Sequence, residues 1–233
     1  MCRRRLMNLR TPCTAAVGLV VVLAATAGAS TGPPRLQQRA IAQTKLLFQH
    51  LEGPQQTASP ATCNEGQRPS GTRGAFLLPT RSFGSGDATF TCRVSARVVV
   101  LDLGGAIATE DDRGSDGSVW ETEDGEVLLF TRANLERICD DLLSRFLPSA
   151  APATLDSHPI RGTAVSTRAF NVRVNPGAPE PLYQDSIDLG HPGRLAASYC
   201  GWKAEIPLSR GRHVIKVDLA DDTHFTYNIK VGR

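Results

Sequence analysis

The chain has 233 residues, with 26 lysines and arginines against 23 aspartates and glutamates, a formal net charge of +3 at pH 7. The basic side chains are scattered and form no clustered stripe of the kind that contacts phosphates, so nucleic-acid binding is disfavoured. The 15 prolines and 21 glycines divide the chain into short segments and indicate many turns.

Residues 1–29 have the layout of a cleavable secretory signal peptide. A basic stretch without acids comes first and contains four arginines: Arg3, Arg4, Arg5 and Arg10. The apolar run that follows, over 15–27, is shorter than the roughly twenty residues that a membrane-spanning helix requires. Small residues predict cleavage near Ala27 or Ala29.

Two alternatives remain for this segment: an uncleaved membrane anchor, and a twin-arginine signal suggested by Arg4 and Arg5. Cleavage removes four arginines and leaves 22 basic against 23 acidic side chains, so the mature chain is nearly neutral. We therefore expect a secreted or cell-envelope protein with no membrane span after signal cleavage.

The mature chain is predicted to begin with a helix over 35–51, because Leu36, Ala40, Leu47 and Leu51 share one helical face. We expect this helix to cover an open end or face of the main fold. Residues 53–70 are rich in Pro, Gln, Thr and Ser and are predicted to form a loop. The expected organisation is a signal peptide at 1–29, an N-terminal helix and linker at 30–60, and one disulfide-stapled domain at 61–233.

Short β-branched and aromatic segments predict strands over 74–79, 88–94 and 97–103. One amphipathic helix is predicted near 132–147, because apolar residues recur there at helical spacing: Leu135, Ile138, Cys139, Leu142, Leu143 and Phe146. Thr131 is a suitable N-cap, and Pro148 cannot continue the helix.

The last third of the chain returns to the two-residue alternation of half-buried strands. Segments at 170–174, 200–206, 213–219 and 225–231 show it, and a four-residue loop in the final hairpin would pair Leu219 with His224. The predicted fold class is mostly β: an antiparallel β-sandwich, jelly-roll or immunoglobulin-like, with the 132–147 helix packed on it.

Four cysteines remain after cleavage: Cys63, Cys92, Cys139 and Cys200. An even number in an exported chain indicates two disulfides, and we predict the pairs Cys63–Cys92 and Cys139–Cys200 because each joins segments that are plausible neighbours. The alternatives are a zinc site or a nucleophilic thiol. The sequence has no C-x-x-C pair, which weakens the zinc alternative.

Several short segments resemble a group of uncharacterised secreted bacterial proteins. That group has a C-x-x-G-Q motif, matched by residues 63–67, and ends in P-L-S-x-G-x-H-x-I and T-Y-x-h-x-V strands, where h is an apolar residue. The two strand motifs are matched by residues 207–215 and 226–231. The resemblance covers most of 41–231, except for 107–155. It implies a secreted sandwich-type domain and carries no activity with it.

One local pattern suggests a metal site. Counted as a calcium loop, the segment 112–123 places Asp112, Asp116 and Glu123 at ligand positions 1, 5 and 12. Gly114 at position 3 removes a ligand, and the preceding residues are β-like instead of helical. The structural alternative is an acidic hairpin loop, which we favour over calcium.

Catalytic signatures are weak. The spacing G-x-S-x-G of serine hydrolases is missing, and His213, in phase with Ile215, is interpreted as a partly buried structural histidine. An acid–base role for this histidine would require contact with a nucleophile. Trp202 is predicted to be a core residue, and Trp120 is the plausible exposed ring for a carbohydrate.

The sequence therefore favours a secreted, non-catalytic binding or structural module without a cofactor. Its ligand would be an unidentified extracellular molecule or cell-envelope component. The first alternative is a small extracellular hydrolase acting on a glycan or peptide, and the second is a calcium-stabilised adhesion domain.

Overall fold

The fold is described from a computed structural model, which covers residues 32–50, 62–63, 74–79, 87–110, 119–174, 187, 190–219 and 223–232. The predicted signal peptide lies outside the described residues. Within them the chain is mostly β, as predicted, with two helices, α1 (Pro34–His50) and α2 (Leu135–Phe146).

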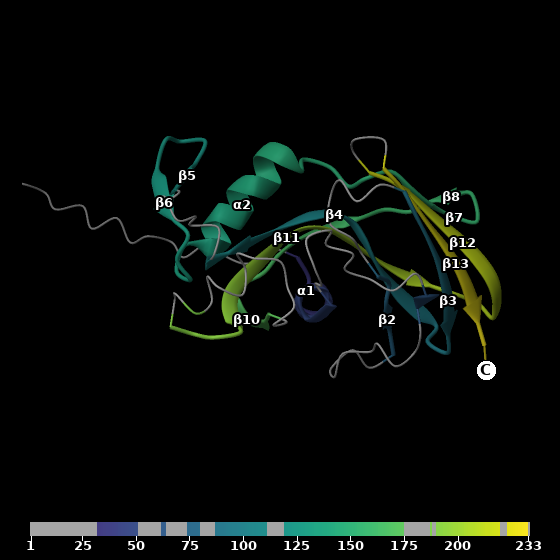
Figure 1. Cartoon of the computed structure of the whole chain (residues 1–233). Helices are drawn as coiled ribbons and strands as arrows, with labels where there is room; N and C mark the ends of the chain where they lie inside the picture. The colour runs from purple at the N-terminus through teal and green to yellow at the C-terminus, as the bar shows by residue number, and fades with distance from the viewer. Residues whose placement is uncertain are drawn as a thin grey trace, which may run out of the picture.

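The described strands form three sheets (Figure 1). The first sheet has the order β1-β3-β13-β12-β7-β8: β1 (Thr62–Cys63), β3 (Ala88–Val94), β13 (His224–Val231), β12 (Gly211–Asp218), β7 (Ala153–Leu155) and β8 (His158–Pro159). The second has the order β10-β11-β4-β2, with β9 also paired to β11: β10 (Phe170–Arg173), β11 (Arg194–Pro207), β4 (Val98–Thr109), β2 (Phe76–Leu77) and β9 (Thr163–Ser166). The third is the hairpin of β5 (Val119–Glu121) and β6 (Val127–Leu129).

The prediction that the sheets are antiparallel is wrong in part. Strand β3 pairs in parallel with both β1 and β13, and β2 pairs in parallel with β4, so the two large sheets are mixed. Alternation along a strand indicates which side chains are buried. It does not indicate whether a neighbouring strand from a distant part of the chain runs parallel or antiparallel to it. The type of sandwich, jelly-roll or immunoglobulin-like, stays a prediction.

The two long strands β4 and β11 carry a helix on each side of part of their length (Figure 1). Along β11, Ala196 and Cys200 pack with α2, whereas Ala197 and Tyr199, on the opposite face, pack with α1. Toward the end of the strand, Ala204 and Ile206 belong to a third cluster shared with the first sheet. One strand therefore contributes to three parts of the core, because its side chains alternate between two faces and its length carries one of these faces from α2 to the first sheet.

A glycine in β4 accommodates a shift in register between these two strands. The register shifts between Gly201 and Lys203 of β11, where one residue of β11 lies opposite two of β4, and Gly104 at the bulge has a φ of +100°. Glycine adopts this backbone conformation without the steric penalty that a Cβ would bring.

Both predicted helices are present, with shifted ends. Helix α2 stops at Phe146, two residues before Pro148, as predicted. Its N-cap is Asn134 instead of Thr131, and Thr131 accepts the Asn134 backbone N–H in a turn that precedes the helix. Neither helix of the described residues has the length and apolar character that a membrane crossing requires.

The terminal hairpin is as predicted except for its register. Asp218, not Leu219, pairs with His224, and Ile215 pairs with Tyr227. Directly opposed residues of an antiparallel pair share one face, so the buried side chains of β12 must face the buried side chains of β13. The predicted register violates that condition, and packing of the buried face explains the one-residue difference.

Candidate functional site

Polar side chains gather at several places in the described structure, and three of these clusters contain a titratable side chain with partners from other elements. The aspartate hub consists of Trp120, Glu123, Asp141 and Arg145. The histidine cluster consists of Asp156, Ser209 and His213. The lysine cluster consists of Gln43, Asp102, Tyr199 and Lys203. Each is held by hydrogen bonds between segments that are distant in sequence.

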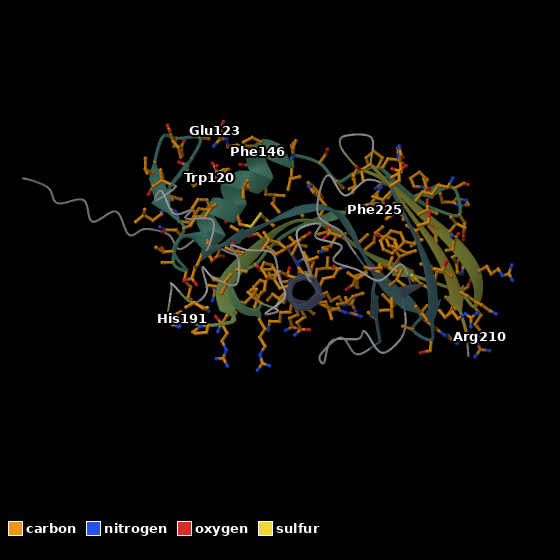
Figure 2. The ribbon with its side chains drawn as sticks, in the orientation of Figure 1. Trp120, Glu123, Phe146, His191, Arg210 and Phe225 are labelled. Carbon is orange, nitrogen blue, oxygen red and sulfur yellow. A yellow bond between two sulfur atoms is a disulfide. The ribbon has the colours of Figure 1, made fainter. Side chains whose placement is uncertain are left out.

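The aspartate hub fastens the β5–β6 hairpin to helix α2. Asp141 Oδ2 accepts the indole N–H of Trp120 at 2.7 Å and Arg145 Nη1 at 3.1 Å, and its Oδ1 accepts the backbone N–H of Glu123 at 3.0 Å. The Trp120 ring also meets Phe146 edge to face, with centroids 6.1 Å apart (Figure 2). This carboxylate thus supplies two contacts from α2 to a hairpin that has no partner strand among the described residues.

The hub depends on the ionised form of Asp141. Burial by itself raises the pKa of this carboxyl group, but the hydrogen bonds from Glu123, Trp120 and Arg145 outweigh it and keep the pKa below its ordinary value. The charged form is therefore the one that the hairpin contacts stabilise.

The outer side of the hairpin exposes apolar side chains. Val119, Val127 and Leu129 are 47%, 60% and 52% exposed, and Phe146 on α2 is 59% exposed. We call Val119, Val127 and Leu129 the hairpin face, because they alternate with Trp120 and Leu128, which point to the core. Single exposed apolar side chains are common on protein surfaces, whereas these three lie together on one face of a small sheet.

Acidic side chains accompany the hairpin face. Residues 119–129 contain Glu121, Glu123, Asp124 and Glu126 and no lysine or arginine. Glu126 is paired with Arg137 of α2. The hairpin therefore combines apolar side chains with a negative rim.

The histidine cluster lies at the end of the first sheet. His213 Nδ1 is 2.7 Å from Asp156 Oδ2, and Nε2 is 3.4 Å from the hydroxyl of Ser209 and 3.1 Å from its carbonyl oxygen. The hydrogen bond from His213 is the main cause that lowers the pKa of Asp156, followed by the bond from the Val214 N–H. The prediction of a partly buried, hydrogen-bonded histidine is confirmed, since its side chain is 12% exposed.

This cluster also places a hydroxyl next to the histidine, which sequence reasoning missed. A neutral ring with its proton on Nδ1 can accept the Ser209 hydroxyl at Nε2, whereas a protonated ring donates from Nε2 to the Ser209 carbonyl. Asp156 reaches the ring from a two-residue turn, Asp156 and Ser157, in which both residues have positive φ. Only the pairing of β7 with β12 brings this turn to His213.

The lysine cluster is enclosed between α1 and the second sheet. Lys203 is 1% exposed, and its Nζ lies 2.6 Å from Asp102 Oδ2, 2.7 Å from Gln43 Oε1 and 4.2 Å from the centre of the Tyr199 ring. Burial lowers the pKa of Lys203, while Asp102 opposes that shift. Nothing in the local sequence marks these residues, because they come from three separate elements.

Two glycines make room for Tyr199. A Cβ on Gly105 or on Gly201 would come within 2.5 Å of the tyrosine hydroxyl. The ring therefore lies flat over the two glycines of neighbouring strands, and its hydroxyl donates to Asp102 Oδ1 at 3.2 Å.

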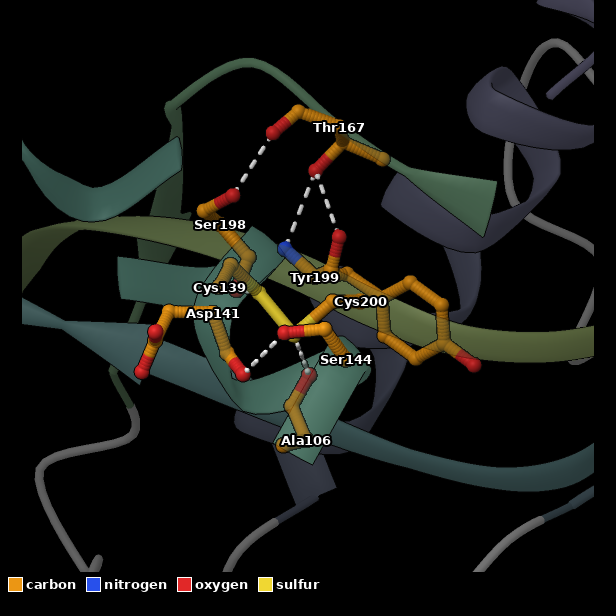
Figure 3. Close-up of a disulfide and its surroundings, with 8 residues drawn as sticks. All are labelled: Ala106, Cys139, Asp141, Ser144, Thr167, Ser198, Tyr199 and Cys200. Atoms are coloured by element: carbon orange, nitrogen blue, oxygen red, sulfur yellow. Dashed lines mark hydrogen bonds between the residues drawn. A yellow bond between two sulfur atoms is a disulfide. The ribbon is translucent and has the colours of Figure 1, made fainter. Parts of the chain in front are cut away.

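The predicted disulfide Cys139–Cys200 is confirmed and joins α2 to β11 (Figure 3). Beside it, the Ser198 hydroxyl donates to the Thr167 carbonyl at 2.6 Å, and the Thr167 hydroxyl accepts the Tyr199 backbone N–H at 2.9 Å. Cys92 is also disulfide-bonded, and its register partner on β1 is Cys63, whose side chain lies outside the described residues. The pair Cys63–Cys92 stays a prediction.

The weak calcium loop cannot be placed as a whole, because Asp112 and Asp116 lie outside the described residues. Glu123 belongs to the aspartate hub through its backbone N–H. Among the described residues, no group of three or more His, Cys, Asp or Glu side chains could hold a metal ion.

The two tryptophans differ from their predicted roles in one respect. Trp202 packs against the core and donates from its indole to the Leu147 carbonyl at 2.8 Å, in line with the prediction. Trp120 is turned toward α2 and Phe146 is the exposed ring, because Asp141 supplies a partner for the indole N–H.

Comparisons of the chain with protein-family models, curated proteins and solved structures found no match.

Proposed function

We propose that the protein is a non-catalytic binding domain that acts outside the cytoplasm and recognises a protein partner through the hairpin face. The observation that carries this proposal is the exposure of Val119, Val127 and Leu129 on a hairpin that Asp141 fixes to α2. A rigidly held apolar surface loses little conformational entropy on binding, which favours affinity. The location rests on the predicted signal peptide and on the resemblance to secreted bacterial proteins.

The chemistry of the hairpin indicates the partner's chemistry. The outer face carries Val119, Val127 and Leu129 together with Glu121, and the acids at 123, 124 and 126 lie in the same hairpin, which has no basic residue. A segment that alternates apolar and basic side chains complements both features, and an extended segment can pair with a strand edge. We therefore propose an extended, basic and apolar segment of another protein as the ligand.

The test uses a short synthetic peptide in which valine and lysine alternate, titrated into the mature protein. We expect binding that weakens as salt is added, since exposed charges are screened over about 8 Å at physiological ionic strength. The double variant Val127→Ser/Leu129→Ser should bind at least about tenfold more weakly, because each buried apolar side chain contributes about 1.5–3 kcal/mol.

Two controls decide the outcome. A peptide in which glutamate replaces lysine should not bind, and Val214→Ser, which changes a 37% exposed valine on β12, should leave affinity unchanged. Equal binding of the valine–lysine peptide to wild type and to the double variant would exclude the hairpin face as the binding surface.

A second candidate, a small extracellular hydrolase, is favoured by one observation: the contacts from Ser209 through His213 to Asp156. In such an enzyme His213 would take the proton of the Ser209 hydroxyl, and Asp156 would orient the ring. A fluorophosphonate probe tests this role, because it labels activated serines. Labelling of Ser209 that disappears in His213→Gln and persists in Ser144→Ala would support the hydrolase, and no labelling would rule it out.

A further inference from the structure

A lysine and an aspartate lie directly opposite each other in the second sheet. Asp102 of β4 and Lys203 of β11 are Cα partners in an antiparallel pair, immediately after the bulge. Both side chains point to the face covered by α1, and Nζ lies 2.6 Å from Oδ2. The two reacting groups of an amide condensation are therefore held in contact by the sheet itself.

The two oxygens of Asp102 have different surroundings. Oδ2 contacts only the lysine nitrogen among the described hydrogen bonds. Oδ1 accepts two hydrogen bonds, from the Tyr199 hydroxyl and from the Gly104 backbone N–H, each at 3.2 Å. Two donors on one oxygen stabilise the negative charge that this oxygen would carry in a tetrahedral intermediate, and they leave the other oxygen free to depart.

Burial disfavours the charged form of the lysine. Its side chain is 1% exposed, so burial removes the hydration of the ammonium group, whereas the face of the Tyr199 ring and the Asp102 carboxylate act in the opposite direction. A buried ion pair loses the hydration of both charges, so transfer of a proton from Nζ to Oδ2 relieves a desolvation penalty. Burial lowers the pKa of Lys203, in agreement with this direction. The product of the transfer is a neutral amine beside a neutral carboxylic acid.

We propose that Lys203 and Asp102 form an intramolecular amide crosslink between β11 and β4. The Nζ lone pair attacks Cγ of Asp102, and the Nζ–Cγ bond forms while charge develops on Oδ1. The Cγ–Oδ2 bond then breaks, and Oδ2 leaves as water with its own proton and one proton from Nζ. No oxidant, reductant or co-reactant is required, because one amine and one acid become one amide and one water.

Neighbouring groups have separate roles in this reaction. Tyr199 and the Gly104 N–H contact the oxygen that stays. Gln43 accepts a hydrogen bond from Nζ at 2.7 Å and donates its own amide to the Leu78 carbonyl at 2.8 Å, so it is a positioning residue. Holding the reactants together replaces a bimolecular encounter, which lowers the entropic part of the barrier.

Mass spectrometry of the intact exported protein, with its disulfides reduced, tests the proposal. The wild type should be lighter than its uncrosslinked mass by one water molecule. Comparison with Lys203→Met makes the position of the mature N-terminus irrelevant, because both proteins share it. The measured mass difference between the two proteins should differ by one water molecule from the difference that the substitution alone would produce. In the control Lys216→Met, which changes an exposed lysine on β12, the mass should differ from that of the wild type only by the change from lysine to methionine.

Trypsin digestion of the wild type provides a second measurement that does not depend on any variant folding. A branched peptide should join residues 98–113 to residues 195–210, with no cleavage after Lys203. Tyr199→Phe keeps the ring but removes the hydroxyl donor, so the crosslinked fraction should fall at least about tenfold at early times. A wild type with the full uncrosslinked mass and separate peptides would overturn the proposal and leave an ion pair only.

Discussion

The contact between Asp141 and the β5–β6 hairpin can be tested by one conservative substitution, Asp141→Asn. The carboxylate accepts three hydrogen bonds, two on Oδ2 and one on Oδ1. Asparagine has one acceptor oxygen, and its NH₂ group must then face either the Glu123 N–H or the pair of donors from Trp120 and Arg145. At least one hydrogen bond to a charged group is lost in either orientation.

A hydrogen bond to a charged group contributes about 1.5–3 kcal/mol, so we expect the hairpin to lose about 2 kcal/mol of local stability. This corresponds to roughly a thirtyfold larger open population, because 1.4 kcal/mol is a factor of ten. Hydrogen exchange followed by mass spectrometry measures that opening directly. Amides at 119–129 should exchange roughly thirtyfold faster, whereas those of β13 should not change.

A matched control is Asp218→Asn on β12, an aspartate whose side chain is 63% exposed and which contacts His224. Its hairpin exchange should equal that of the wild type. Unchanged exchange at 119–129 in Asp141→Asn would refute the assignment of Asp141 as the residue that fixes the hairpin.

The same contact predicts a pH dependence with a definite sign. The folded pKa of Asp141 lies below its ordinary value, so the stabilisation is complete above the unfolded pKa and is lost as the pH falls through the folded pKa. Hairpin exchange in the wild type, after correction for the intrinsic chemical rate, should therefore accelerate in acid. The Asp141→Asn variant should lack this part of the acid response.

Two further predictions concern the core. Replacing Cys139 and Cys200 by alanine should lower the free energy of unfolding by about 4 kcal/mol, because the disulfide closes a loop with a sequence separation of 61; urea denaturation measures this, and a loss below about 1 kcal/mol would contradict it. Gly105→Ala should lower the free energy of unfolding by about 1–3 kcal/mol, since its Cβ would meet the Tyr199 hydroxyl. Gly232→Ala, with no atom within 4 Å of its Cβ, is the control, and equal melting temperatures for the two variants would contradict the packing of Tyr199 over the glycines.

Local patterns predicted the elements whose burial repeats regularly along the chain. The apolar stripe of α2 and the alternation in β12 and β13 both arise from one buried face, and this face is visible in the order of residues. The position of Cys139 on the α2 stripe likewise indicated a bond into the core, and the Cys139–Cys200 pair is present. The partial burial of His213 followed from the same alternation.

The sites themselves could not be predicted in this way. Asp102 and Lys203 are 101 residues apart, and Gln43 reaches the lysine from 160 residues away. Trp120 lies inside and Phe146 outside because Asp141, 21 residues from the tryptophan, accepts the indole N–H. In each case the role of a side chain depends on a partner that is distant in the sequence, so the neighbouring residues do not reveal it.

The order of residues alone determined which faces of the helices and strands are buried, because burial of apolar side chains depends on a local repeat of two or 3.6 residues. Only the tertiary structure decided which strands run in parallel, which glycines accommodate Tyr199, and which carboxylate meets the buried lysine. Those choices depend on the joint packing of segments far apart in the chain, where space and charge must be matched at the same time.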